Sequence, residues 1–251
     1  KTNGVPILNY ITKNIKNYGS VPDHVDWRKY DIIKRVKDQN ICAACWAFSV
    51  VGNIESHLMI HLKMPVTLSE QFLIDCSEYS KGCGNTPLLK TFSTIVTDIG
   101  GVLRDQDYYP YSLKKERCRW SGVKEYSNAL PIPVVGVRRV QNDEEVMKEA
   151  IFKHGPLSAA INSAAMGRYG NCSNVWIDEP TDEECNPKEL DHTILIVGYS
   201  AYINNDTGTV TPYWIIKNSW GKNWGDEGFY YLVSGRNACG IASDVSFAYV
   251  T

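Results

Sequence analysis

Eight cysteines are the feature that most constrains the fold of this 251-residue chain. They are spread over both halves of the sequence, at positions 42, 45, 76, 83, 118, 172, 185 and 239. Two N-glycosylation sequons begin at Asn171 and Asn205. Sequons are modified on surface loops of secreted proteins, and disulfides persist in the same compartments. Together they predict a disulfide-bonded glycoprotein of the secretory pathway, lysosomal or extracellular.

The composition excludes several classes of protein. The chain is 43% hydrophobic and 22% charged, which are ordinary values for a globular protein. Its 26 basic and 28 acidic residues nearly cancel, without the basic stripe of a nucleic-acid binder. The longest apolar runs, such as 193–197, are too short to span a membrane. We therefore expect neither nucleic-acid binding nor membrane insertion.

The two halves of the chain differ in periodicity. The first half predicts helices, and the second half predicts strands with one helix among them. Pro65 ends the first helix, and a capping box over 67–70 opens the second. This order favours an α+β protein with two lobes. The expected helices are 44–62, 71–76, 87–99 and 143–154, and the expected extended segments are 131–135, 157–161, 193–199, 213–217, 229–233 and 245–250.

Cys45 stands where the first predicted helix begins. Free backbone N–H groups and the positive end of the helix dipole favour an anion at this place. A thiol there loses its proton more easily, and the thiolate is the nucleophilic form. Gln39 lies a few residues upstream and offers a side-chain amide near the same point.

A thiolate nucleophile needs a partner that holds and delivers a proton. His192 opens an apolar strand directly after Asp191, which favours a functional histidine over a structural one. Asn218 ends another apolar strand and is suited to orient the imidazole. Trp220 follows it and can shield the contact from water.

These motifs, taken together, resemble the papain family of cysteine proteases. The segment 42–46, Cys-Ala-Ala-Cys-Trp, matches the family's nucleophile signature except for Ala43 in place of glycine, and His192 follows at the expected distance. Asn218 lies farther away, which we attribute to a loop insertion over 201–211. The resemblance covers 21–251 and extends through segments 21–28, 68–71, 75–77 and 218–228. The absence of an insertion between Cys83 and Cys118 is typical of the cathepsin L and F group rather than cathepsin B.

The resemblance implies a fold and a set of roles. The fold has a helical lobe (about 29–131) and an antiparallel β-barrel-like lobe (about 132–251, joined by 21–28), with the active-site cleft between them. Residues 1–20 are expected to be an N-terminal extension or a remnant of a pro-segment. Cys45 attacks the peptide carbonyl, His192 pairs with it as an imidazolium, and Asn218 orients His192. The Gln39 side chain and the Cys45 N–H form the oxyanion hole.

The family's disulfides carry over to the pairs Cys42–Cys83, Cys76–Cys118 and Cys185–Cys239. Cys45 stays free in this scheme. Because seven cysteines remain beside it, Cys172 is left without a partner in the chain.

The predicted cleft differs from the family pattern at two glycines. Ala43 replaces one, and Thr86 replaces the second glycine of a Gly–Gly pair, with Asn85 in the first position. Since glycine permits close backbone approach, both changes are expected to narrow the cleft. Asp244 is placed at the bottom of the S2 pocket, where a carboxylate would accept basic as well as apolar side chains. The remaining residues expected to line the cleft are Ala160, Leu190, Asp191, Thr193 and Trp220.

We therefore expect a cysteine endopeptidase without a metal or cofactor. Its partners would be peptide or protein substrates, its own pro-segment and cystatin-like inhibitors, and it would be a monomer. The altered glycines leave a second hypothesis, an inactive homologue that acts as a binding or structural protein. A metal or redox role for the Cys42–Cys45 pair is disfavoured because the sequence has no second CxxC motif. A zinc site at His57 and His61 is disfavoured because this segment lacks the glutamate of a zinc-binding helix.

Overall fold

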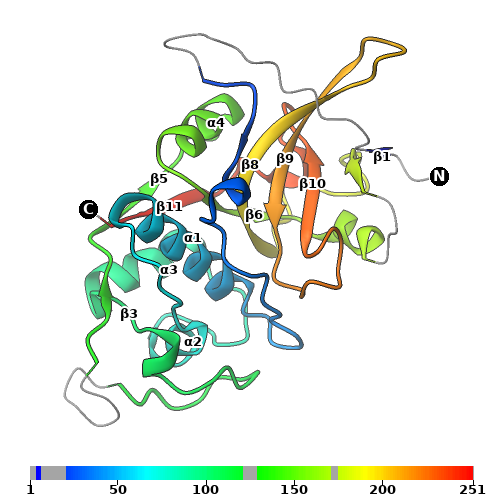
Figure 1. The fold of residues 1–251 in the computed structure, drawn as a ribbon. Helices are drawn as coiled ribbons and strands as arrows, with labels where there is room; N and C mark the ends of the chain where they lie inside the picture. The colour runs from blue at the N-terminus through cyan, green and yellow to red at the C-terminus, as the bar shows by residue number, and fades with distance from the viewer. Residues whose placement is uncertain (1–3, 7–20, 121–128, 171–174, 251) are drawn as a thin grey trace.

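The computed structural model describes residues 4–6, 21–120, 129–170 and 175–250. A group of helices packs against one large sheet, as the α+β prediction requires (Figure 1). The helices are α1 (Cys45–Leu62), α2 (Glu70–Cys76), α3 (Leu88–Thr94) with its π-helical continuation (Ile95–Ile99), and α4 (Glu144–Lys153). None of the helices in these ranges has the length and apolar character needed to cross a membrane.

Helix α1 is the central element. It lies between the sheet and α3 (Figure 1), and its residues from Cys45 to Leu58 are buried. Lys63 ends it in the left-handed conformation, with its N–H bonded to the carbonyl of Leu58. The buried residues lie on nearly all sides of the helix, so the single hydrophobic face that the sequence predicted is only part of its buried surface, which also includes polar side chains.

The caps of the two following helices show one departure from expectation. The hydroxyl that caps α2 belongs to Ser69, which accepts a hydrogen bond from the N–H of Phe72, and not to Thr67 as the capping-box prediction had it. Glu70 is turned away instead to pair with Lys37. The α3 segment ends at Gly100, whose φ of 84° suits a residue without a side chain.

Among the described residues the main sheet has nine strands, which are antiparallel except between β10 and β7. Its path is β1-β7-β10-β9-β8-β6-β11-β5, with β2 added beside β8. The resemblance implied a barrel-like lobe, but the described strands form an open sheet because its end strands, β1 and β5, do not pair with each other. The bounds are β1 (Gly4–Pro6), β2 (Val25–Asp26), β5 (Gly136–Arg139), β6 (Leu157–Ile161), β7 (Trp176–Asp178), β8 (His192–Ile203), β9 (Val210–Lys217), β10 (Phe229–Val233) and β11 (Val245–Tyr249). A separate pair joins β3 (Gly101–Val102) to β4 (Ile132–Pro133).

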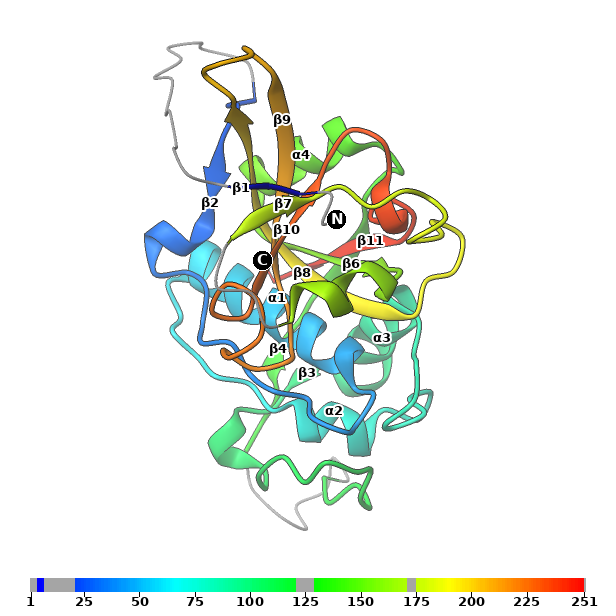
Figure 2. The ribbon, with the colours of Figure 1, turned by 90° about the vertical axis from the view of Figure 1, so that its right-hand side faces the viewer.

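The prediction that 201–211 form a loop is wrong for the parts of the segment that are strand. Most of this segment continues the β8–β9 hairpin, whose ladder runs out to the pair Ile203 and Val210, and only the tip is a turn. The hairpin reaches beyond the body of the molecule (Figure 2). Its polar residues are exposed there, so hydropathy did not signal a strand. The sequon residue Asn205 lies in this exposed turn.

Three disulfides brace the fold, and they are the three pairs that the resemblance implied. Cys42 joins Cys83 and Cys76 joins Cys118 among the helices, while Cys185 joins Cys239 beside the sheet. The loops that they close span 41, 42 and 54 residues, and such bonds typically stabilise a fold by about 2–4 kcal/mol each. Cys172 and the sequon residue Asn171 lie outside the described residues.

Histidines fasten the far end of α1 to the other lobe. His57 Nε2 donates to the carbonyl of Pro156 at 2.9 Å, and His61 Nε2 donates to the carbonyl of His154 at 2.9 Å. The Phe247 ring lies stacked against His57 and His154, at centroid distances of 5.3 and 5.1 Å. Burial lowers the pKa of His57 to about 4, since a charged imidazolium would be poorly solvated there.

This burial predicts a loss of stability in acid. Between pH 6.5 and 4 the unfolded chain protonates His57 and the folded chain does not, so stability falls as the pH falls. At pH 5 the loss from this one group is about 2 kcal/mol relative to pH 7. His57→Gln keeps a hydrogen-bond donor for the carbonyl of Pro156 but has no titrating imidazole. The difference between its free energies of unfolding at pH 7 and pH 5, measured with urea, should be smaller than in the parent by this amount. His61→Gln is the control and should retain it; an unchanged slope in His57→Gln would contradict the assignment.

Candidate functional site

The N-terminus of α1 carries Cys45 to the beginning of β8. Its side chain is 3% exposed, and it is the free cysteine among the residues that the structure describes. Ser49, one turn further along α1, donates from its hydroxyl to the carbonyl of Ile194 on β8 at 2.7 Å. The first turn of α1, which begins at Cys45, therefore lies against the beginning of the strand that His192 opens.

His192 and Asn218 come together because their strands are neighbours. His192 is the first residue of β8, Asn218 follows the last residue of β9, and the two strands pair along their length. His192 Nε2 donates to Asn218 Oδ1 at 2.8 Å, and both side chains are buried. The Trp220 ring lies 4.9 Å from the imidazole, centroid to centroid. With Nε2 committed to Asn218, Nδ1 is the nitrogen left for other chemistry.

Burial acts on the nucleophile and the base in opposite directions. It raises the pKa of the Cys45 thiol, although the hydrogen bonds from Thr193 and Trp46 work against this shift. It lowers the pKa of His192, against the hydrogen bond to Asn218 and the charge of Asp191. A thiolate at Cys45 or an imidazolium at His192 is therefore disfavoured when it is the only charge. Contact between the two opposite charges, or hydrogen-bond donors near the sulfur, would offset the cost of desolvation.

Gln39 is held in one orientation by bonds at both ends of its amide. Its Oε1 accepts from the hydroxyl of Ser219 (2.6 Å), and its Nε2 donates to the carbonyl of Cys42 (3.1 Å). The Gln39 backbone N–H also donates to the carbonyl of Ser219 (2.8 Å). One amide hydrogen remains for a further acceptor. These bonds hold the side chain beside the segment that leads into α1.

Three of the residues expected in the S2 pocket, Thr193, Ala160 and Asp244, are linked through their backbones. Thr193 pairs with Ala160 across β8 and β6, and the Ala160 N–H donates to the Asp244 carbonyl at 2.9 Å. Asp244 is partly buried, and burial raises the pKa of its carboxyl against the opposing charge of Arg139. Leu190 is partly buried and packs against Gly240, where a β-carbon would lie 2.5 Å from Leu190 Cδ2.

The other predicted cleft residues differ in exposure. Ala43, Asn85 and Asp191 are exposed, and Asp191 accepts hydrogen bonds from the backbone N–H (2.7 Å) and hydroxyl (3.2 Å) of Ser163. Thr86 is buried, and its hydroxyl donates to the carbonyl of Gly84 at 3.3 Å. The Thr86 side chain is therefore bonded back to its own loop.

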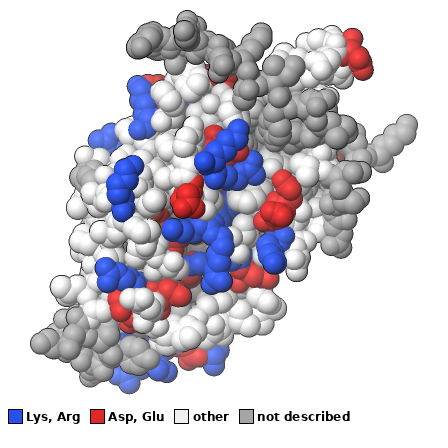
Figure 3. Space-filling view, in the orientation of Figure 1, with Lys and Arg blue, Asp and Glu red and all other residues white. Residues whose placement is uncertain are grey.

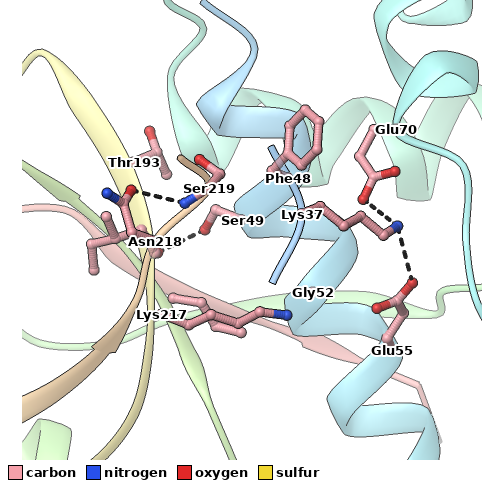
Figure 4. Close-up of a pocket in the computed structure, with 12 residues that line it drawn as sticks. Lys37, Phe48, Ser49, Gly52, Glu55, Glu70, Thr193, Lys217, Asn218 and Ser219 are labelled. Atoms are coloured by element: carbon pink, nitrogen blue, oxygen red, sulfur yellow. Dashed lines mark hydrogen bonds and ion pairs between the residues drawn. The ribbon is translucent and has the colours of Figure 1, made fainter. Parts of the chain in front are cut away.

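Sequence reasoning missed a buried group of charges next to the site. Lys37 bonds to Glu70 at 2.6 Å and lies 3.8 Å from Glu55, while Lys217 directs its ammonium toward α1 (Figure 4). Burial raises the pKa of Glu70 to about 7 and lowers that of Lys217 to about 8. These four residues line one pocket together with Thr193, Asn218 and Ser219. Two features of the sequence could have indicated this group. Glu55 lies among apolar residues of α1, and Lys217 lies at the end of the apolar strand β9.

On the face seen in Figure 3, basic and acidic side chains are interspersed, in agreement with the near-zero net charge.

A buried thiol at a helix N-terminus, beside a His–Asn pair on adjacent strands, coincides with a match to a known family. Residues 21–249 match the family model described as papain family cysteine protease. The chain belongs to the papain family. It is 36% identical over 227 residues to cathepsin F of Drosophila melanogaster, covering 90% of this chain and 35% of that relative's length.

Solved structures of the family show the same fold. The bromelain protease of Ananas comosus, determined with the E64 inhibitor, is 30% identical with a TM-score of 0.76, covering 92% of this chain and 100% of that one. Procathepsin L 3 of the Tenebrio molitor larval midgut is 29% identical with a TM-score of 0.75, covering 99% and 75%. The predicted papain-like fold and family are thereby confirmed.

The buried charges give a prediction for stability. Lys37→Met leaves Glu70 and Glu55 without their nearest cation, and breaking such a buried group costs about 3–5 kcal/mol. The loss should be larger at pH 8 than at pH 5, because protonation of Glu70 relieves the uncompensated charge. Urea unfolding of this variant is compared with Lys222→Met, an exposed lysine expected to change stability by less than about 0.5 kcal/mol. Equal, small losses in both variants would refute a structural role for Lys37.

Proposed function

We propose that this protein is an endopeptidase that cleaves peptide bonds through Cys45. The observation that carries the proposal is the His192–Asn218 hydrogen bond at the start of β8, the strand against which the first turn of α1, with Cys45 as its first residue, is packed. A thiol, a base and a group that orients the base are the parts that nucleophilic catalysis requires. Membership of the papain family supports the same reaction class.

The proposed reaction has two halves. The Cys45 thiolate forms a C–S bond to the substrate carbonyl carbon, and the C–N bond then breaks as His192 gives its proton to the leaving amine. Neutral His192 next takes a proton from water, whose oxygen attacks the thioester. The C–S bond breaks, the carboxylic product leaves, and the thiolate and imidazolium are restored.

Two donors are assigned to the oxyanion. Cys45 is the first residue of α1, and the first N–H groups of a helix have no acceptor within it. The remaining amide hydrogen of Gln39 is the second donor, fixed by the bonds to Ser219 and Cys42. A donor of this kind typically lowers the barrier by about 3 kcal/mol.

The working form is proposed to be an ion pair. Burial penalises a lone thiolate and a lone imidazolium, but transfer of the proton from Cys45 to His192 creates opposite charges together. Asn218 holds the imidazolium through Nε2, and the N-terminus of α1 favours the thiolate.

Labelling with an epoxysuccinyl inhibitor tests this function. We expect one adduct per chain, on Cys45, in intact-mass and peptide-map measurements. His192→Ala should slow its formation by at least about 100-fold, because general acid–base partners contribute about 10²–10⁴. Lys222→Met serves as the matched surface control and should label like the parent.

The second hypothesis is a papain-like binding protein without activity. Ala43 and Thr86 suggested it, but Thr86 turns its hydroxyl to Gly84 and Ala43 is exposed at the surface. A folded chain that forms no adduct at Cys45, and in which Ala43→Gly with Thr86→Gly does not restore labelling, would favour this hypothesis over the enzyme.

For specificity, we propose an S2 pocket that accepts both apolar and basic side chains. Ala160, Leu190 and Thr193 would supply its walls, and the Asp244 carboxylate would pair with a positively charged substrate residue. An apolar floor would reject such a charge. The Asp244 side chain is half-buried, so its carboxylate is accessible to a ligand.

Peptide substrates with Leu or Arg two residues before the scissile bond test this pocket. We expect Asp244→Ala to lower kcat/KM for the Arg substrate about tenfold, as a lost charge-assisted contact typically does, and to change the Leu substrate little. Asp244→Asn is the isosteric control for charge. An unchanged Arg-to-Leu ratio in both variants would exclude Asp244 from the pocket.

We further propose that the enzyme arises as a zymogen in the secretory pathway, with a lysosomal or extracellular destination. Its disulfides and the exposed Asn205 sequon support this route. Residues 1–20 would be an extension or pro-segment remnant ahead of a peptidase domain over 21–251; of these residues the structure describes only 4–6, which pair with β7. The pro-segment and cystatin-like inhibitors would be its partners, and the enzyme would act as a monomer.

A further inference from the structure

Glu144, the first residue of α4, binds a loop that lies far away in the sequence. Its Oε2 accepts hydrogen bonds from the indole N–H of Trp214 (2.9 Å) and the backbone N–H of Gly235 (2.7 Å). Its Oε1 accepts one from the backbone N–H of Asn237 (2.5 Å). Hydrogen bonds to a carboxylate are about twice as strong as those between neutral groups. The carboxylate therefore fastens residues 235–237 to α4 and, through Trp214, to β9.

The loop that begins at Gly235 has an unusual backbone conformation. Positive φ angles of 101°, 53°, 53° and 75° occur at Gly235, Asn237, Cys239 and Gly240. Asn237 and Cys239 carry side chains, which raise the energy of this conformation. Such a loop keeps its shape only where the surrounding contacts over-determine it. Here Glu144 holds the beginning of the loop, and the disulfide at Cys239 holds its middle.

Asn237 connects the bound end of this loop to its other end. Its Oδ1 accepts a hydrogen bond from the backbone N–H of Ala242 (2.9 Å), and its Nδ2 donates to the hydroxyl of Ser243 (3.3 Å). Its carbonyl accepts one from the backbone N–H of Gly240 (3.0 Å). Ser243 directly precedes Asp244. The side chain that Glu144 fixes in place thus orders the residues that lead into the proposed S2 pocket.

The second half of the loop contacts two residues proposed for that pocket. The carbonyl of Asp244 accepts a hydrogen bond from the backbone N–H of Ala160 at 2.9 Å, which joins the end of the loop to β6. Gly240 lies directly against Leu190, since a β-carbon on Gly240 would come within 2.5 Å of Leu190 Cδ2. The conformation of the loop therefore sets where Asp244 and Leu190 lie.

We propose that Glu144 and Asn237 are positioning residues for the S2 specificity of the enzyme. They act through the loop over 235–243, and neither is among the residues proposed to line the pocket. This inference rests on the proposed peptidase function and on the place of Asp244 in S2. A binding site works only when its side chains are held within about 0.5 Å of the productive arrangement. Loss of this support should weaken substrate binding and leave the reaction at Cys45 unchanged.

Glu144→Gln tests the first positioning residue. The amide keeps the shape but replaces one acceptor oxygen by an NH₂ group, which cannot accept from a backbone N–H. For peptides with Leu or Arg two residues before the scissile bond, we expect KM to rise about fivefold with little change in kcat, an effect within the range of couplings in one hydrogen-bond network. Alkylation of Cys45 by iodoacetamide, a small reagent that does not use S2, should keep the parental rate.

Glu145→Gln is the matched control for this variant. Glu145 is the next residue of α4, is exposed, and pairs with Lys148 at 2.7 Å on the helix surface. The substitution removes the same charge at the same end of the helix without touching the loop. It should leave KM, kcat and the rate of alkylation at their parental values.

Asn237→Gly tests the second positioning residue and does not depend on the folding of the Glu144 variant. It removes the bonds to Ala242 and Ser243 but keeps the backbone N–H that Glu144 binds. Glycine adopts a positive φ readily, so the variant adds no strain to the loop. We expect the same rise in KM and the same parental alkylation. Asn237→Asp keeps an acceptor for the N–H of Ala242 and should restore most of the binding.

A double-mutant cycle shows whether the effect passes through the pocket. Glu144→Gln should lower kcat/KM for the Arg substrate much less in an Asp244→Ala background than in the parent, because residues that act through one another are not additive. Additive effects would overturn the inference, and so would parental KM values in both Glu144→Gln and Asn237→Gly. Alkylation slowed as strongly as KM is raised would also overturn it, since the whole site would then be disturbed.

Failure of the proposed function has a different signature. The parent chain itself would then neither cleave the peptides nor form the epoxysuccinyl adduct on Cys45, and the positioning role would fall with it. A parent that cleaves and labels, beside Glu144 and Asn237 variants that match it in KM, would refute only the positioning role.

Discussion

The packing of α1 against the sheet is the interaction on which the rest of this structure depends. Its side chains reach into the other lobe: Ser49 donates to the carbonyl of Ile194 at 2.7 Å, and Asn53 donates to the carbonyl of Pro156 at 2.9 Å. The same helix brings Cys45 to β8 with its first turn. One rigid element therefore joins the lobes and places the nucleophile, so that any shift of α1 against β8 alters the distance between thiol and base.

The buried polar groups along α1 explain why this arrangement is specific. Glu55, Ser49 and His57 each find a partner on another segment, and an unpartnered group of this kind would cost about 1–3 kcal/mol. Sliding or rotating the helix would break several of these bonds together. The geometry of the candidate site thus depends on hydrogen bonds that lie outside it. A site that holds side chains in a fixed, desolvated arrangement usually requires such support from the surrounding residues.

Much of the site was accessible from the sequence because its members lie at the ends of regular elements. Cys45 opens an amphipathic run, His192 opens an apolar strand, and Asn218 closes another, so each stood out as a polar residue at a boundary. The buried charges escaped notice because Glu55 and Lys217 lie inside apolar segments, and nothing local shows which partners they meet. The hairpin over 201–211 was missed because its outer strands are polar and exposed.

The sequence by itself determined most of the element types, the family, the three disulfide pairs that the family implies, and the side chains that we propose to react. These follow from local periodicity and from motifs read in order along the chain. Only the tertiary structure decided which groups surround the sulfur, where the Gln39 amide is anchored, and that the sheet stays open. Such features depend on contacts between segments far apart in the chain, as between Ser49 and Ile194 or Gln39 and Ser219. Pairing across such separations is a property of the folded packing, because burial and hydrogen bonding of one group are set by neighbours that its own segment does not specify.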